Sequence, residues 1–151
     1  MRRTVGILAA ALLGAALAVA PGVAGAAPGG APAIPLNPEQ ETPPAVSDGS
    51  GFFSYTVDGD ELCYTLEVRD LTAAPVAAHI HVGPRNVAGP IVIGLTTPPA
   101  ATSTVSACLT AAEGGEMTPA ELAALVDDPR AHYVNVHTPM FPGGEVRGQL
   151  K

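Results

Sequence analysis

The stretch "GFFSYTVDGDELCYTLEVRD", residues 51–70, decides the fold. Apolar side chains recur at every second position on both sides of the central Asp58-Gly59-Asp60. Such a period of two is typical of strands with one buried face, and glycine supplies the positive φ that a tight turn needs. The stretch therefore predicts an antiparallel hairpin whose inward side chains are Phe53, Tyr55, Val57, Leu62, Tyr64, Leu66 and Val68.

Further short strands are expected on both sides of this hairpin. An edge strand begins at about Leu36, and the others cover residues 77–82, 91–95, 104–109, 131–137 and 145–150. Turn-forming residues separate them at short spacing, which indicates an all-β fold, an antiparallel β-sandwich or barrel.

One short helix is predicted in "MTPAELAALVDDP", residues 117–129. Thr118 and Glu121 have the spacing of a capping box, and Pro119 stands at the first helical position, where its missing N–H costs nothing. The helix is about two turns long, and its expected buried stripe consists of Leu122, Leu125 and Val126.

The N-terminus has the pattern of a secretory signal peptide. Two arginines precede an uncharged apolar run, and small residues follow at positions 24–27, so we predict a signal peptide at 1–27 and a flexible linker at 28–35. A single domain would then occupy 36–151, in a secreted, extracellular protein with no membrane span in its mature chain. Removal of 1–27 would leave 5 basic and 14 acidic side chains, a balance that argues against nucleic-acid binding.

The two cysteines, Cys63 and Cys108, are expected to form a disulfide. An even number of cysteines in an oxidising compartment favours pairing, and two free buried thiols are the alternative.

Three histidines form the candidate site. Because side chains alternate across a strand, His79 and His81 share the face opposite Ala78 and Ile80, and His137 opposes the apolar face of its own strand. Neutral imidazoles that converge in this way suit copper or zinc. His-x-His also occurs on strands without metal, so a hydrogen bond from His137 to Glu145 or to a loop carbonyl is the competing interpretation.

Three other polar side chains share these non-core faces. Asn135, Glu145 and Arg147 lie on the last two strands, where Glu145 could orient a ligand ring or form an ordinary surface ion pair with Arg147. His132 falls on the Val134 side of its strand, which indicates a structural role.

The segments "AAHIHVGPRNVAGPIVIGL" and "YVNVHTPMFPGGEVRGQL" closely resemble the CHRD domain, first described in chordin and common in secreted bacterial proteins. "GEVRGQL" after "VNVHT" is the most specific part, and the resemblance covers about residues 36–151. It implies an immunoglobulin-like β-sandwich or barrel and leaves the biochemical role open.

A second segment, "LEVRDLTAAPVAAHIHVG", is similar to the part of copper/zinc superoxide dismutase that supplies two copper ligands as His-x-His. His79 and His81 match that pair, and His137 matches a later copper histidine. The bridging histidine, the zinc-binding loop and the active-site arginine segment of that family have no counterpart here.

Two functions follow. The first is an extracellular interaction module of CHRD type without defined catalysis, whose partner is an unknown extracellular protein or surface component. The alternative is a copper- or zinc-binding metalloprotein. Catalytic residues are assigned in neither case.

Overall fold

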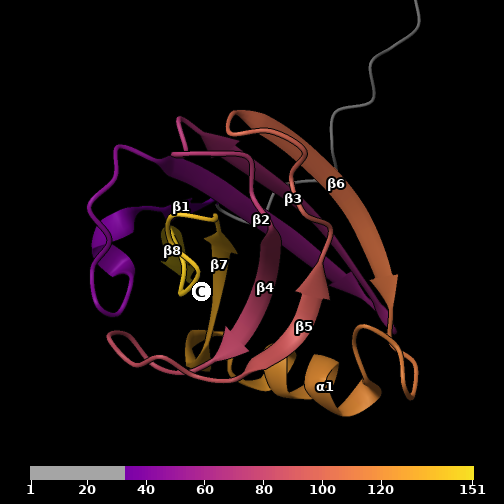
Figure 1. Ribbon diagram of the computed structural model, residues 1–151. Coiled ribbons are helices and arrows are strands. Elements are labelled where there is room, and N and C mark those ends of the chain that lie inside the picture. Colours follow the sequence, from indigo (N-terminus) through magenta and orange to yellow (C-terminus); the bar gives the residue numbers. More distant parts are fainter. Residues whose placement is uncertain (1–32) are drawn as a thin grey trace, which may run out of the picture.

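A computed structural model describes residues 33–151, so the predicted signal peptide lies outside the described residues. Two four-stranded antiparallel sheets face each other, with the strand orders β1-β2-β3-β6 (sheet A) and β5-β4-β7-β8 (sheet B) (Figure 1). The predicted fold class, a β-sandwich with one short helix, is confirmed.

The predicted elements are present, and their boundaries coincide with the prediction or differ from it by one or two residues. The elements are β1 Ile34–Leu36, η1 Pro38–Gln40, β2 Ser50–Asp58, β3 Glu61–Arg69, β4 Ala77–Val82, β5 Ile91–Leu95, β6 Ser103–Thr110, α1 Pro119–Asp127, η2 Pro129–Ala131, β7 His132–His137 and β8 Val146–Gln149. The two short 3₁₀ helices, η1 and η2, were not predicted, because neither segment has a hydrophobic period.

The hairpin β2–β3 forms the centre of sheet A and supplies much of the core. Its register runs from Ser50 opposite Arg69 to Asp58 opposite Glu61. Phe53 and Leu62 are fully buried, whereas Phe52, on the other face, is 40% exposed. The period of two therefore sorts the side chains of this hairpin as predicted.

Cys63 and Cys108 form the predicted disulfide. They lie directly opposite each other on β3 and β6, with 45 residues of chain between them. The alternative of two free buried thiols is wrong, because strand pairing brings the two sulfurs together on the face of sheet A that points away from the core.

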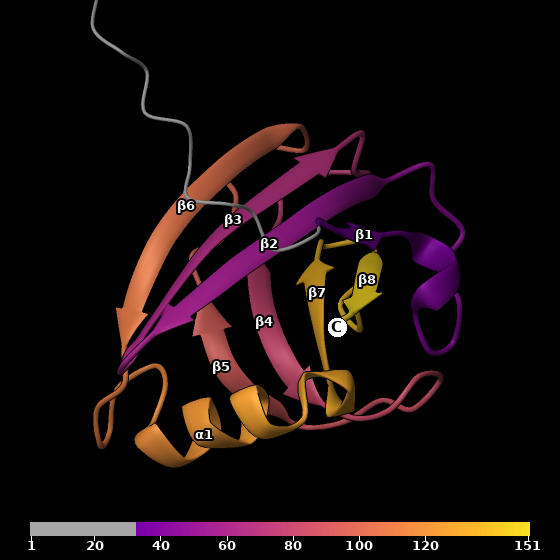
Figure 2. The same ribbon diagram turned by 180° about the vertical axis from the view of Figure 1, so that it is seen from behind.

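Helix α1 lies across one end of the sandwich (Figure 2). The Thr118 side chain accepts a hydrogen bond from the Glu121 N–H, and the Glu121 carboxylate accepts one from the Thr118 N–H, so the predicted capping box is confirmed. Leu122 and Leu125 are buried as expected. The placement of Val126 in the buried stripe is wrong, since it is 57% exposed and lies about 100° around the helix from Leu125.

The two sheets join along one side of the sandwich. Asn37, directly after β1, forms a backbone bridge to Arg147 of β8, with N–H···O distances of 3.1 Å in both directions. On the opposite side, β5 and β6 are the edge strands of their sheets. Within residues 33–151, main-chain hydrogen bonds therefore join the two sheets along one side of the sandwich.

Sheet B carries a polar outer face that loops cover. Its inner face consists of core residues such as Ile80, Val134 and Val136. Its outer face bears histidines, Asn135, Arg147 and Gln149, most of them buried. Residues 37–49, 83–90 and 138–145 fold over this outer face and supply hydrogen-bond partners to it.

No helix in the described part of the chain is long and apolar enough to cross a membrane.

Candidate functional site

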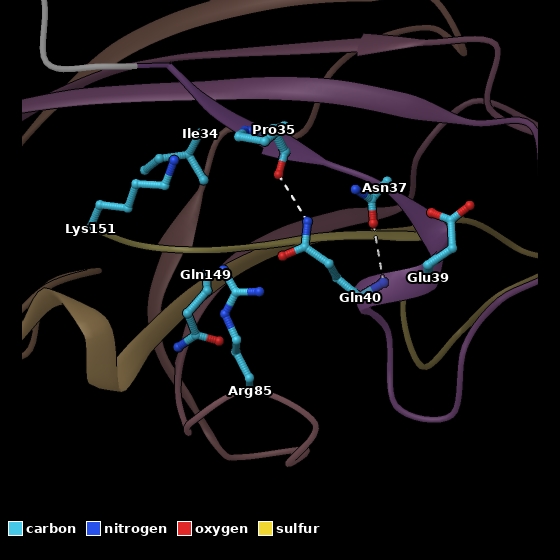
Figure 3. Close-up of a pocket in the computed structure, with 8 residues that line it drawn as sticks. All are labelled: Ile34, Pro35, Asn37, Glu39, Gln40, Arg85, Gln149 and Lys151. Carbon is cyan, nitrogen blue, oxygen red and sulfur yellow. Dashed lines mark hydrogen bonds between the residues drawn. The ribbon is translucent and has the colours of Figure 1, made fainter.

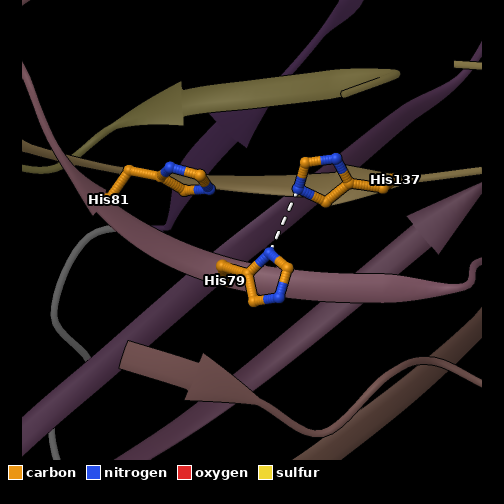
Figure 4. Close-up of side chains that lie close together, drawn as sticks. All are labelled: His79, His81 and His137. Atoms are coloured by element: carbon orange, nitrogen blue, oxygen red, sulfur yellow. Dashed lines mark hydrogen bonds between the residues drawn. The ribbon is translucent and has the colours of Figure 1, made fainter. Parts of the chain in front are cut away.

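His79, His81 and His137 converge on the outer face of sheet B. Strands β4 and β7 pair so that His79 lies opposite Asn135. His81 lies two residues along β4 from His79, and His137 lies two residues along β7 from Asn135. One ring nitrogen from each histidine lies within 4.8 Å of the other two, and the nitrogens point into a common space (Figure 4). The structure thus brings together the three residues that sequence parity placed on this face.

Backbone carbonyls fix the tautomers of two rings. His81 Nδ1 lies 2.9 Å from the Gly89 carbonyl, and His137 Nδ1 lies 3.0 Å from the Pro142 carbonyl. A carbonyl oxygen only accepts, so both Nδ1 atoms carry the proton and both Nε2 atoms keep a lone pair. The rings are therefore oriented with their basic nitrogens toward the common space.

His79 faces the common space with Nδ1, whereas His81 and His137 face it with Nε2. Its Nδ1 lies 3.1 Å from His137 Nε2, the shortest contact within the cluster. Since His137 Nε2 carries a lone pair, His79 Nδ1 donates in this arrangement. A proton shift from Nδ1 to Nε2 of His79 would leave three inward lone pairs, so one tautomer change converts the hydrogen-bonded set into a ligand set.

The Nε2 atom of His81 is buried and has no hydrogen-bond partner among the described residues. His81 as a whole is 7% exposed and stacks on the Tyr133 ring, with centroids 4.8 Å apart. A buried acceptor without a donor is costly, on the order of 1–3 kcal/mol. This atom is therefore poised to take a cation or a proton donor.

The environment keeps the three imidazoles neutral. Burial lowers the pKa of His79, and the neighbouring His81 lowers it further. Burial also lowers the pKa of His81 and of His137, although hydrogen bonds to the Gly89 and Pro142 carbonyls oppose this. Neutral imidazole is the form that ligates metal, so the site favours the ligating state.

Two further buried polar side chains, Asn135 and Glu41, lie beside Gly144, and Asn135 is the β7 residue opposite His79. Asn135 is 2% exposed, and its Oδ1 lacks a donor among the residues described. Glu41 is 4% exposed and also has an unpartnered oxygen, Oε1. Burial raises the pKa of Glu41 to about 7, although the Arg147 guanidinium and Asn135 favour its charged form.

Sequence reasoning missed Glu41. It lies in "NPEQETPP", residues 37–44, where prolines interrupt every periodic pattern. Nothing in that segment indicates that it folds back onto sheet B, and a carboxylate is rarely buried without an ionic partner.

Glu145 does not orient a histidine. It is fully buried, and its carboxylate accepts hydrogen bonds from the Ser47 hydroxyl, from the backbone N–H and hydroxyl of Thr72, and from the Thr138 hydroxyl. Although burial raises its pKa, these donors lower it more, and the net pKa is lowered. Glu145 thus holds residues 47 and 72 against the start of β8. The hydrogen bond to His137 that was expected from Glu145 is made by the Pro142 carbonyl instead.

Arg147 is not a surface residue either. It is 1% exposed, its guanidinium carbon lies 3.3 Å from the centroid of the Tyr133 ring, and it donates to the carbonyls of Pro84 and Val87. The expected surface ion pair with Glu145 is wrong, because the two side chains are buried in separate hydrogen-bond networks. Arg147 instead holds the 83–90 loop against sheet B.

The two remaining candidates do not join the site. His132 is buried, and its Nδ1 lies 2.9 Å from the Asp128 carbonyl, which agrees with a structural role. The sulfurs of Cys63 and Cys108 lie near Glu61, but they are bonded to each other and cannot act as thiolate ligands.

Comparison with known proteins identifies the family. No curated protein and no solved structure matches the chain. The model of the CHRD domain matches residues 33–150, which include every strand of both sheets and all three clustered histidines. The chain therefore belongs to the CHRD domain family.

Proposed function

We propose that this domain is a secreted binding module that holds one copper or zinc ion through His79, His81 and His137. The observation that carries the proposal is the convergence of three imidazole nitrogens within 4.8 Å. The unpartnered lone pair of the buried His81 Nε2 supports it independently.

The spacing of the nitrogens suits a small transition ion. Three nitrogens that bind one ion at about 2.0 Å lie roughly 3.5 Å apart in a trigonal arrangement. The present separations, from 3.1 Å to at most 4.8 Å, reach that value by small side-chain rotations. Imidazole nitrogen is a good ligand for both copper and zinc, and the set leaves one coordination position for an exogenous ligand.

Secretion is part of the proposal. The predicted signal peptide and the Cys63–Cys108 disulfide both fit an oxidising compartment. An extracellular module can bind its partner without catalysis, so the proposal assigns the ion to binding and leaves all catalytic roles unassigned.

Titration calorimetry of the metal-free protein with Cu²⁺ and with Zn²⁺ tests the proposal. The wild type should bind one ion per chain, and His81→Ala should weaken binding by more than about 100-fold, because loss of a mere supporting contact already costs 10- to 100-fold. His132→Ala is the matched control, since it removes the one described histidine outside the cluster.

His79→Ala provides a second test, because His79 is the least buried ring of the three and its loss disturbs the fold least. Circular dichroism establishes that each variant is folded. One-to-one binding that survives both His81→Ala and His79→Ala, or negligible heat with the wild type for both metals, would rule out the site.

A further inference from the structure

Positive charge is concentrated in one part of an acidic domain. The chain has 14 acidic side chains and seven Lys or Arg, of which Arg2 and Arg3 lie outside the described residues. Of the five cations that remain, Arg69 pairs with Glu67 on sheet A. The other four line adjoining hollows beside β8: Arg85, Arg130, Arg147 and Lys151.

The hollows form a continuous groove. One of about 470 Å³ lies between β1, η1 and β8 (Figure 3), and a second of about 520 Å³ extends toward Arg130. Arg85, Gln149 and Lys151 line both, so the groove passes from one into the other. A third hollow of about 160 Å³ connects Arg85 to the buried Arg147.

The cations of the groove are not neutralised by direct pairing. Within residues 33–151, none of the four has a carboxylate oxygen within 4.0 Å. Arg147 donates only to neutral oxygens, those of Pro84, Val87 and Gln149. Glu39 is the acidic side chain that lines the groove, and Glu41 lies behind it near Arg147. The groove is thus a positive region on a negative domain, which steers anions to it.

Two amide side chains, those of Asn37 and Gln40, line the same hollow as Arg85 (Figure 3). Asn37 Oδ1 accepts from the Gln40 N–H, and Gln40 Nε2 donates to the Pro35 carbonyl, so both amides are held in place. The other polar atom of each amide, Asn37 Nδ2 and Gln40 Oε1, has no hydrogen-bond partner among residues 33–151. One of these groups donates and the other accepts, which is the combination that a sugar hydroxyl needs.

We propose that this groove binds an acidic oligosaccharide, with a uronate carboxylate at Arg85 and sugar hydroxyls at Asn37 and Gln40. The planar guanidinium matches a carboxylate in a two-point hydrogen-bonded pair. Hollows of about 470 and 520 Å³ offer far more room than a single small ion needs, which suits a chain of sugars. The proposal does not depend on metal binding, since none of the three histidines lines these hollows.

Fluorescence anisotropy with a labelled galacturonate oligomer tests the proposal on the full mature chain in chelator. Arg85→Glu should weaken binding by about tenfold or more, because it removes a charge-assisted pair and adds a repulsive charge. Arg69→Glu is the matched control, with the same charge change on sheet A, and it should leave the affinity unchanged to within about twofold.

Two unlabelled competitors complete the experiment. A neutral maltooligosaccharide of equal length should not displace the probe, and inorganic phosphate at matched charge concentration should displace it poorly. Equal weakening by Arg85→Glu and Arg69→Glu would reduce the effect to overall charge and overturn the proposal. So would full displacement by phosphate, which would leave a simple anion site, or the absence of binding by the wild type.

Discussion

Replacement of Glu41 by glutamine should stabilise the domain at neutral and alkaline pH and leave it unchanged in acid. Glu41 is 4% exposed, and burial raises its pKa from 4.5 to about 7. Glutamine has nearly the same shape as the protonated acid and never ionises. It therefore keeps the packing and removes the cost of a buried charge.

The size and the pH window follow from linkage. The unfolded chain ionises Glu41 near pH 4.5 and the folded chain near pH 7, so the unfolded state binds fewer protons between these values. The wild type therefore loses stability as the pH rises through this window. At 1.36 kcal/mol for each unit between the two pKa values, the loss reaches about 3 kcal/mol above pH 7.

The assay is urea unfolding of wild type and Glu41→Gln at several pH values from 4.5 to 8.5. Chelator keeps the histidine cluster metal-free, and the difference between the two proteins cancels the titration of the histidines. The free-energy difference should rise from near zero at pH 4.5 to about 3 kcal/mol at pH 8. Glu39→Gln makes the same chemical change at an exposed position of η1 and is the matched control, since surface substitutions usually change stability by under about 0.5 kcal/mol. A difference for Glu41→Gln that does not change with pH would refute the reasoning.

Two other changes have definite expected outcomes. Gly144 has φ +127°, and a β-carbon there would collide with Glu41 Oε1, so Gly144→Ala should lower the free energy of unfolding by about 1–3 kcal/mol. Gly143 has open space around it, so Gly143→Ala should leave the thermal midpoint nearly unchanged, and equal midpoints for both variants would contradict this account. The double variant Cys63→Ser/Cys108→Ser should lose about 4 kcal/mol in urea unfolding, because the disulfide closes a 45-residue separation. An unchanged urea midpoint with an unchanged slope would show that the crosslink does not stabilise the fold.

The sequence predicts those parts of the fold that a local period determines. Alternation of apolar and polar residues located the β2–β3 hairpin and the strand of His79 and His81, and parity alone placed these rings on the face opposite Ile80. The pairing partner of each strand could not be obtained in this way. The convergence of His137 with the other two rings depends on the pairing of β4 with β7, which local patterns do not encode.

The cover over sheet B was not predictable from local patterns. Segments 37–49 and 83–90 consist largely of prolines, glycines and polar residues, which usually indicate solvated loops. They lie on the sheet because single long-range contacts hold them, such as Ser47 to Glu145 and Arg147 to the Val87 carbonyl. Such contacts have no periodic signature, so a residue expected at the surface, Arg147, is buried.

Because β1 and β8 lie on the side where the two sheets are joined, the edges of residues 33–151 that could pair with a strand of another molecule are those of β5 and β6. The outer edge of β5 is partly occupied, since the Gly94 N–H donates to the Glu116 carbonyl, whereas β6 offers the eight residues Ser103–Thr110 without a charge or a proline. Charges and prolines are the usual guards against strand addition. Edge-to-edge association in concentrated solution should therefore start at β6. A single lysine introduced on that strand should reduce this association.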